Sequence, residues 1–139
     1  MERPIIEVTF HYKDFQCCVI FQSFGFRCGY VLVPQWHSYF EQDYDDIPII
    51  CHGGLTYSSH EFLGQKYPGW WIGFDCAHTG DLTDKESLMR YFGNNKQDSF
   101  FNMLNFLTGN DTSFGTVKTL DFCIQECKNI VDQLVEDGD

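Results

Sequence analysis

The stretch IIEVTFHYKDFQCCVIFQSFGFRCGYVLVP at residues 5–34 determines the fold class. Its first eight residues alternate between apolar and polar side chains, so we expect Ile6, Val8 and Phe10 on one face of a strand. The Lys-Asp pair that follows is a turn sequence. FQCCVIFQSF is then a second strand, and FGFRCGYVLVP is a third that Pro34 ends. Three strands on short connections predict an antiparallel meander.

Later stretches predict two more strands and two short helices. PIICHGG at residues 48–54 is a short apolar strand that enters a turn, and YPGWWIGFDC at residues 67–76 is another strand. Successive side chains of a strand point to opposite faces, so we expect only one of Trp70 and Trp71 in the core. KESLMRYF and DSFFNMLNFLTG are helical stretches, and the segment before PIICHGG is a loop or a short helix.

The most regular helical pattern lies near the C-terminal end. Apolar residues recur there at three-and-four spacing, at Val117, Leu120, Ile124, Cys127, Val131 and Leu134. Thr116 is the expected N-cap of this helix, and we expect the tail EDGD to fray. An amphipathic helix packed on a mainly antiparallel sheet predicts a single α+β domain over residues 1–139.

Composition restricts the classes of partner. The 139 residues are 43% hydrophobic and 17% aromatic, which is enough for one packed core. The 20 acidic residues outnumber the 9 basic ones and give a net charge of −11, which disfavours direct binding to nucleic acid. The charge fits either a solvated surface that favours solubility or an acidic surface that meets a basic protein partner.

Cysteine content and hydropathy indicate the compartment. No apolar run is long enough to span a membrane, and the N-terminal stretch MERPIIEVTFHYKD has no apolar segment typical of a signal peptide. The seven cysteines are odd in number and include no C-x-x-C pair, which argues against a zinc ribbon. We therefore expect a cytoplasmic protein with mostly reduced, buried thiols.

The first candidate site motif is CHGGLTYS, which begins at Cys51. Its two glycines permit positive φ or a close approach of the backbone to a ligand. The motif supplies a candidate catalytic group, His52, and the candidate ligand contacts Gly53, Gly54, Thr56 and Tyr57. The alternative is a plain turn beside a surface or core histidine.

The second motif, WWIGFDCAHTGD, ends at Asp81 and is more specific. A strand end that runs into a glycine-containing loop is a common position for functional residues. The candidate catalytic residues in this loop are Asp75, Cys76, His78 and Asp81. The alternative is local, because both aspartates can bond loop amides and His78 can be structural.

These residue types suggest two chemistries. The nitrogen and oxygen atoms of His52, Asp75, His78 and Asp81 are suitable ligands for zinc, manganese or iron. A divalent metal would activate water, with a spare carboxylate as the base. Cys76 and His78 could instead form a nucleophilic pair, although no third residue that orients them is evident.

Ligand binding is a further interpretation of the same motifs. Trp70 and Trp71 offer ring faces for stacking, and the glycines expose backbone amides. That combination suits a small polar molecule with a planar ring, such as a nucleotide.

The segments GYVLVPQWH, HGGLTYS and WWIGFDCAHTGD resemble motifs of a family of small bacterial and bacteriophage proteins. The similarity covers about residues 27–82. It adds His37, in the Pro-x-x-His turn, to the residues of the two motifs as a candidate ligand contact. The resemblance implies a shared site and a phage or prokaryotic setting, and it does not imply a reaction.

Three functions remain open at this point. The first is a phage-type protein that sequesters a nucleotide-like immune signal and so counters host defence. The second is a metal-dependent hydrolase that uses the same residues. The third is an acidic inhibitor of the anti-CRISPR type that docks on a basic host nuclease and needs no pocket.

Overall fold

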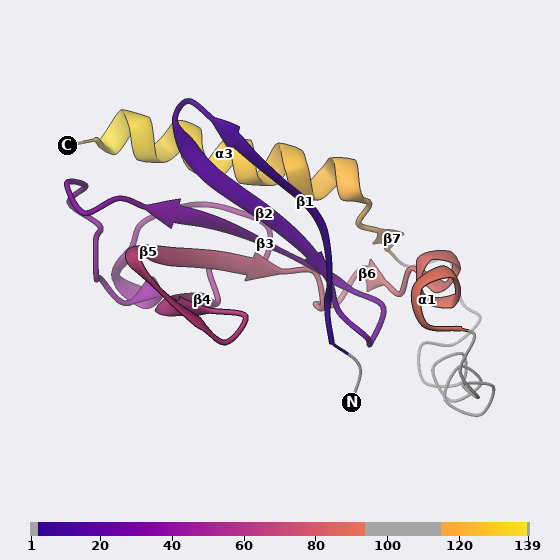
Figure 1. Ribbon diagram of the computed structural model, residues 1–139. Helices are drawn as coiled ribbons and strands as arrows, with labels where there is room; N and C mark the ends of the chain where they lie inside the picture. Colours follow the sequence, from indigo (N-terminus) through magenta and orange to yellow (C-terminus); the bar gives the residue numbers. More distant parts are fainter. Residues whose placement is uncertain (1–2, 94–114, 139) are drawn as a thin grey trace.

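The computed structural model describes residues 3–93 and 115–138. Its largest element is a five-stranded antiparallel sheet in the spatial order β1-β2-β3-β5-β4 (Figure 1). The strands are β1 (Ile5–Tyr12), β2 (Phe15–Phe21), β3 (Arg27–Val33), β4 (Tyr57–Phe62) and β5 (Gln65–Asp75). Lys13 and Asp14 have the positive φ angles typical of a two-residue hairpin turn. The predicted meander is therefore confirmed.

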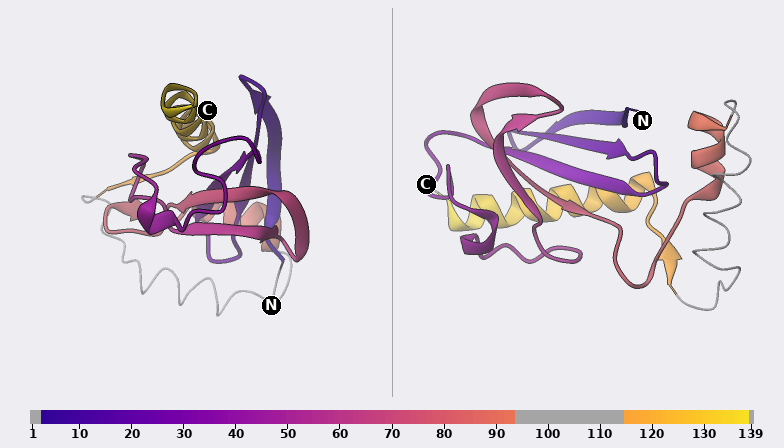
Figure 2. Two further views of the ribbon diagram at one scale, coloured as in Figure 1. Left: turned by 90° about the vertical axis from the view of Figure 1, so that its left-hand side faces the viewer. Right: turned by 90° about the horizontal axis from the view of Figure 1, so that it is seen from below.

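One long helix, α3 (Leu120–Asp137), runs along one face of the sheet (Figures 1 and 2). It contacts β1, β2 and β3. Its buried residues are Cys123, Cys127, Ile130, Val131 and Leu134. The predicted α+β class is confirmed. No helix among the described residues is long and apolar enough to cross a membrane.

The predicted start of this helix is wrong. Thr119 is the N-cap, and its hydroxyl oxygen accepts a hydrogen bond from the Phe122 N–H at 3.1 Å. The predicted cap, Thr116, belongs to the short strand β7 (Thr116–Val117), which pairs in parallel with β6 (Asp81–Leu82). Both residues of β7 are β-branched, so they favour the extended backbone that this pairing uses.

A β-bulge in β1 changes the predicted alternation. The register of β1 against β2 shifts between Ile6 and Val8, which leaves Glu7 as an extra residue. Ile6 is 53% exposed, so it does not share the buried face of Val8 as predicted. Glu7 turns inward instead, and both of its carboxylate oxygens accept hydrogen bonds from buried Arg27, which also pairs with Asp84. The ion pairs fix β1 to β3.

Hydrophobic side chains fill both faces of the sheet. The main cluster lies between the sheet and α3. A second cluster on the opposite face contains Cys18, Ile20, Cys28, Tyr30, Phe62 and Trp71, because the β4–β5 hairpin folds back over that face. Trp71 is 1% exposed and Trp70 is half-buried, so the prediction that only one of them belongs to the core is confirmed.

The predicted strand at residues 48–54 is wrong. Side chains of α3 satisfy its backbone instead: the Ile50 N–H donates to Gln133 Oε1 at 2.8 Å, and the Ile50 carbonyl accepts from Gln133 and Asn129. We name residues 48–54 the docked segment. The strand β4, in contrast, is not evident from the sequence, because YSSHEF lacks a run of apolar residues.

The short helix α1 (Lys85–Phe92) coincides with the predicted stretch KESLMRYF. Leu88 and Phe92 bury their side chains against Phe21 at one end of the sheet (Figure 2). A 3-10 helix at Tyr44–Asp46 agrees with the predicted loop or short helix. The predicted helix DSFFNMLNFLTG lies outside the described residues.

Candidate functional site

The two sequence motifs converge where β5 runs into β6, beside the first turns of α3 (Figure 1). The rings of His52 and His78 have centroids 5.8 Å apart. His52 Nε2 lies 2.9 Å from each carboxylate oxygen of Asp81. The ring of Phe122 on α3 packs edge-on against His52 at 5.3 Å. The two motifs therefore meet in space, as a site that uses residues of both requires.

Asp81 is the centre of this cluster. Its side chain is 1% exposed and accepts hydrogen bonds from His52 Nε2–H, from the His78 backbone N–H at 3.0 Å and from Lys118 Nζ at 3.1 Å. Burial alone would raise the pKa of the Asp81 carboxyl, but these bonds outweigh it and lower the pKa below the usual value of 3.8. Asp81 is therefore a carboxylate at neutral pH.

His78 presents a buried nitrogen to the cluster. Among the described residues, its Nδ1 has no hydrogen-bond partner. This atom lies 3.5 Å from Asp75 Oδ1 and 3.5 Å from Asp81 Oδ2. A buried ring nitrogen without a hydrogen-bond partner is energetically costly. The arrangement therefore suits a site in which a bound atom contacts this nitrogen.

Gly53 is the glycine of the first motif that lies against the cluster. Its φ is +68°, and a Cβ built on it would lie 2.6 Å from His78 Nδ1, so the backbone packs directly against the imidazole. Gly54 has φ +81° but no atom within 4 Å of its missing Cβ. Only the first glycine makes the close approach that the sequence suggests.

Asp75 lies at the edge of the cluster with its side chain 33% exposed. Thr56 Oγ1–H donates to Asp75 Oδ2 at 3.1 Å, and the Ala77 N–H donates to Oδ1 at 3.1 Å. Both aspartates thus bond loop amides, as the local interpretation predicts, and they also face His78. The sequence-predicted residues His52, Asp75, His78, Asp81, Gly53 and Thr56 come together here.

Cys76 does not join the cluster. It is 1% exposed within the main core, and its Sγ lies 3.6 Å from Cys123 Sγ. The contact with Cys123 and burial both raise the pKa of the Cys76 thiol well above its usual range. A buried thiol with a raised pKa is a poor nucleophile, so the geometry does not support the predicted catalytic role.

His37 lies elsewhere. It is 3% exposed, its Nε2–H donates to the Leu134 carbonyl at 2.8 Å, and its Nδ1 accepts the Tyr39 N–H. Leu134 is twelve residues beyond Phe122, which is roughly 18 Å along a helix. His37 therefore anchors the far end of α3, a structural role that explains its burial.

The predicted aromatic contacts also lie away from the cluster. Trp71 belongs to the second core cluster. The Trp70 indole N–H donates to the Gln42 carbonyl at 2.8 Å, and the Tyr57 hydroxyl donates to the Glu61 carbonyl. None of these rings contacts His52 or His78, so the stacking faces and the His/Asp cluster do not form one pocket within the described residues.

Sequence motifs miss two charged partners of the site. Lys118 bonds Asp81, and Glu126 Oε2 accepts the His52 backbone N–H at 2.6 Å. Phe122 and Glu126 are four residues apart and so share one side of α3. The spacing therefore predicts one side of the helix with an aromatic and an acidic residue. It does not indicate which loop packs against that side.

The three ligating side chains are close enough for one metal ion. One ligand atom from each of His52, His78 and Asp81 lies within 4.8 Å of the others. Two imidazole nitrogens and one carboxylate oxygen form a ligand set that catalytic zinc sites use, with a fourth position left for water or substrate.

No protein-family model matches the chain, and neither does any curated protein or solved structure. The family resemblance stated above remains a proposal. It rests on the HGGLTYS and WWIGFDCAHTGD motifs, both of which supply residues to the cluster.

Proposed function

We propose that His52, His78 and Asp81 bind a divalent metal ion of the zinc type, which the protein uses for hydrolysis. The observation that carries the proposal is the buried, unpartnered Nδ1 of His78 beside the Asp81 carboxylate. Burial without a partner is expected to be unfavourable unless another group completes the contact. A metal ion would do so.

Two of the three distances between the ligand atoms are close to those expected around one zinc ion, and the third is within 4.8 Å. Metal bonds of about 2.05 Å place neighbouring ligand atoms about 3.3 Å apart in a tetrahedron. Asp81 Oδ2 lies 2.9 Å from His52 Nε2 and 3.5 Å from His78 Nδ1, on either side of that value. The ion would replace the His52 Nε2 proton that now donates to Asp81, so metal binding should release a proton.

Lys118 is the cation that competes with the ion. Its Nζ contacts Asp81 Oδ1, whereas Oδ2 faces both histidines. The ammonium can therefore remain on one oxygen while an ion occupies the other side. Repulsion between the two cations would weaken metal binding, and Lys118 would then set the affinity rather than supply a ligand.

Asp75 is the candidate general base. Its carboxylate borders His78, is partly exposed and is oriented by Thr56 and by the Ala77 N–H. A bound ion would supply Lewis acidity and lower the pKa of water, and Asp75 would accept the proton. The nucleotide-sequestering alternative depends on Trp70 and Trp71, which lie apart from this cluster, so hydrolysis is the better supported function.

Titration with metal tests the binding step. Protein stripped with a chelator is titrated with Zn²⁺ and Mn²⁺ by calorimetry, and the stoichiometry is checked by native mass spectrometry. We expect one ion per chain and at least tenfold weaker binding in His78→Ala and Asp81→Asn. His11→Gln, which changes an exposed histidine on β1, is the matched control and should bind normally.

The hydrolytic step needs a separate measurement. Metal-loaded protein is assayed against p-nitrophenyl esters and phosphates, with Asp75→Asn as the test variant. We expect Asp75→Asn to bind the metal and lose turnover, because it lacks the base. If His78→Ala and Asp81→Asn both bind metal normally, the proposed metal site is wrong. If Asp75→Asn keeps its turnover, Asp75 is not the general base.

A further inference from the structure

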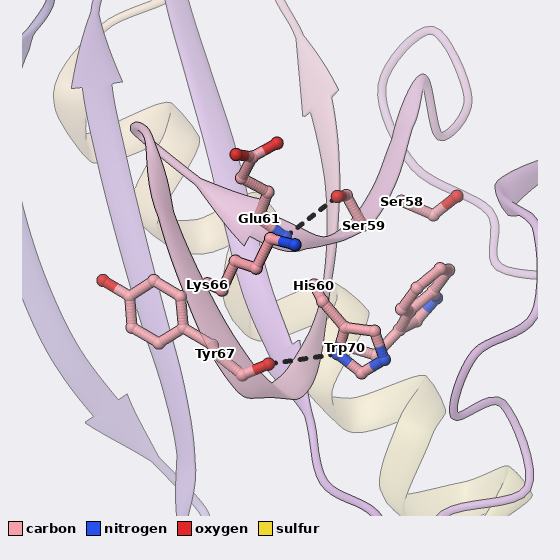
Figure 3. Close-up of a pocket in the computed structure, with 7 residues that line it drawn as sticks. All are labelled: Ser58, Ser59, His60, Glu61, Lys66, Tyr67 and Trp70. Carbon is pink, nitrogen blue, oxygen red and sulfur yellow. Dashed lines mark hydrogen bonds between the residues drawn. The ribbon is translucent and has the colours of Figure 1, made fainter.

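A concave site lies on the β4–β5 hairpin (Figure 3), and its lining includes none of His52, His78 and Asp81. It is lined by residues 58–61 of β4 and by Lys66, Tyr67 and Trp70 of β5, and its volume is about 560 Å³. We name it the hairpin pocket. We propose that it binds a small molecule in which an anionic group is attached to an aromatic ring. The proposal is independent of the metal site.

His60 places an imidazole ring at the hairpin pocket, held in position by three hydrogen-bond acceptors. Its Nδ1 lies 3.1 Å from the Tyr67 carbonyl and 2.7 Å from the Gly69 carbonyl, and carbonyl oxygens only accept, so Nδ1 carries a proton (Figure 3). Its Nε2 lies 2.6 Å from the Glu41 carboxylate, which also accepts. Both ring nitrogens therefore face acceptors only, which favours the doubly protonated imidazolium form of the ring.

Lys66 adds a second cation. It lies opposite Glu61 in the register of the hairpin, yet the two side chains form no ion pair, and Lys66 makes none with any other described residue. Among the described cations, Lys13, Arg27 and Lys118 have carboxylate partners. The Lys66 ammonium is thus available to an anion.

Ser59 supplies a neutral donor beside these charges. Its Oγ accepts the Glu61 N–H at 2.9 Å, and its own hydroxyl proton has no acceptor among the described residues (Figure 3). Hydrogen bonds to an ionised group are stronger than those between neutral groups. An anion between Lys66 and Ser59 would therefore receive one charged and one neutral donor.

The Trp70 ring completes the hairpin pocket. Its indole N–H is held by the Gln42 carbonyl, and the ring meets His60 edge-on at 5.0 Å. The Tyr67 ring packs edge-on against Trp71 at 5.5 Å and so belongs to the second core cluster. Trp70 is only partly buried. A fixed, partly exposed ring beside cations favours a ligand that is both aromatic and anionic.

A β-bulge creates this geometry. The register between β4 and β5 shifts between Ser59 and Glu61, where the single residue His60 faces the four β5 residues from Tyr67 to Trp70, so the extra residues belong to β5. Bulges commonly redirect a side chain, and here the imidazolium turns onto the carbonyls of β5. His60 therefore also has a structural role, so the test of binding relies on Lys66, whose side chain is exposed.

Phenyl phosphate is the test ligand, used with a chelator present so that the metal site cannot contribute. Inorganic phosphate and phenol are the comparison ligands, and binding is followed by NMR through the Trp70 indole N–H and the backbone amides of β4. We expect saturable shifts with phenyl phosphate, weaker shifts with phosphate and none with phenol. Shifts that are the same for phenol and phenyl phosphate overturn the anionic part of the proposal.

Variants separate binding from net charge. Lys66→Gln should weaken phenyl phosphate binding at least fivefold. Lys13→Gln, which removes an equal charge on the turn before β2, should leave the affinity unchanged. Equal losses in both variants would indicate a general electrostatic effect and overturn the hairpin pocket. Ligand-induced shifts confined to residues near His52 and His78 would also overturn it, without bearing on metal binding.

Discussion

Gly53 lies so close to the His78 imidazole that a Cβ on it would come within 2.6 Å of Nδ1. The contact makes one glycine of the HGG turn part of the site, whereas Gly54 borders open space. The two neighbouring glycines thus form a natural pair of test and control positions. Both have positive φ, so an alanine is strained at either one.

We expect Gly53→Ala to displace His78 and to weaken zinc binding more than tenfold. Gly54→Ala should cost about 1 kcal/mol of stability through its backbone alone and leave zinc affinity intact. Calorimetric titration and thermal melts of both variants measure the two effects. Equal zinc affinities in the two variants would show that the contact with His78 has no role in metal binding.

Replacing Lys118 should have opposite effects on stability and metal affinity. Lys118→Met removes a bond from buried Asp81, which we expect to cost about 1–3 kcal/mol in metal-free protein. The same change removes a competing cation, so zinc should bind more tightly. Thermal melts with chelator and with excess zinc report both effects. A loss of zinc affinity would instead identify Lys118 as a residue that supports the ligands.

The cysteines should titrate as seven thiols in denaturant without reductant, because all seven are free in the structure. Burial raises the pKa of Cys17 to about 12 and that of Cys18 to about 11, so native protein should react slowly with a thiol reagent. Cys76→Ser should retain zinc binding. Fast reaction of most thiols in native protein would contradict the buried positions.

The contact between His60 and Glu41 predicts a pH dependence. The hydrogen bond that His60 donates to Glu41 raises the pKa of His60 above 6.5, so this pair stabilises the fold fully below that pH. Its contribution is lost as the pH rises through the folded pKa. Thermal melts of the protein and His60→Gln should therefore differ most at acidic pH and converge toward alkaline pH. Glu41→Gln should show a weaker dependence, and a difference independent of pH would contradict the pairing.

Local periodicity is sufficient to predict the meander and α3, because alternation and three-and-four spacing reflect which side is buried. It fails where a distant partner decides the conformation. Glu7 turns inward because Arg27, on another strand, neutralises it. The docked segment resembles a strand in composition, yet α3 supplies its hydrogen bonds.

The candidate site shows the same division. His52, His78 and Asp81 are recognisable because they lie in glycine-containing turns that follow short apolar stretches. Lys118 and Glu126 belong to the helical end of the chain, and only tertiary packing brings them to the loops. Cys76 is adjacent in sequence to Asp75 but points into the core, which the sequence of a loop does not reveal.

The docked segment has a kinetic consequence. The amides of Ile50 and His52 bond to side chains of Gln133 and Glu126 on α3 rather than to a neighbouring strand. Deuterium uptake at these amides therefore requires their hydrogen bonds to the helical side chains to break, while the sheet can stay intact. Exchange at these two amides would report opening between the docked segment and α3, separately from exchange in the sheet core. The exchange rates would measure how often the loop that carries His52 separates from the helix.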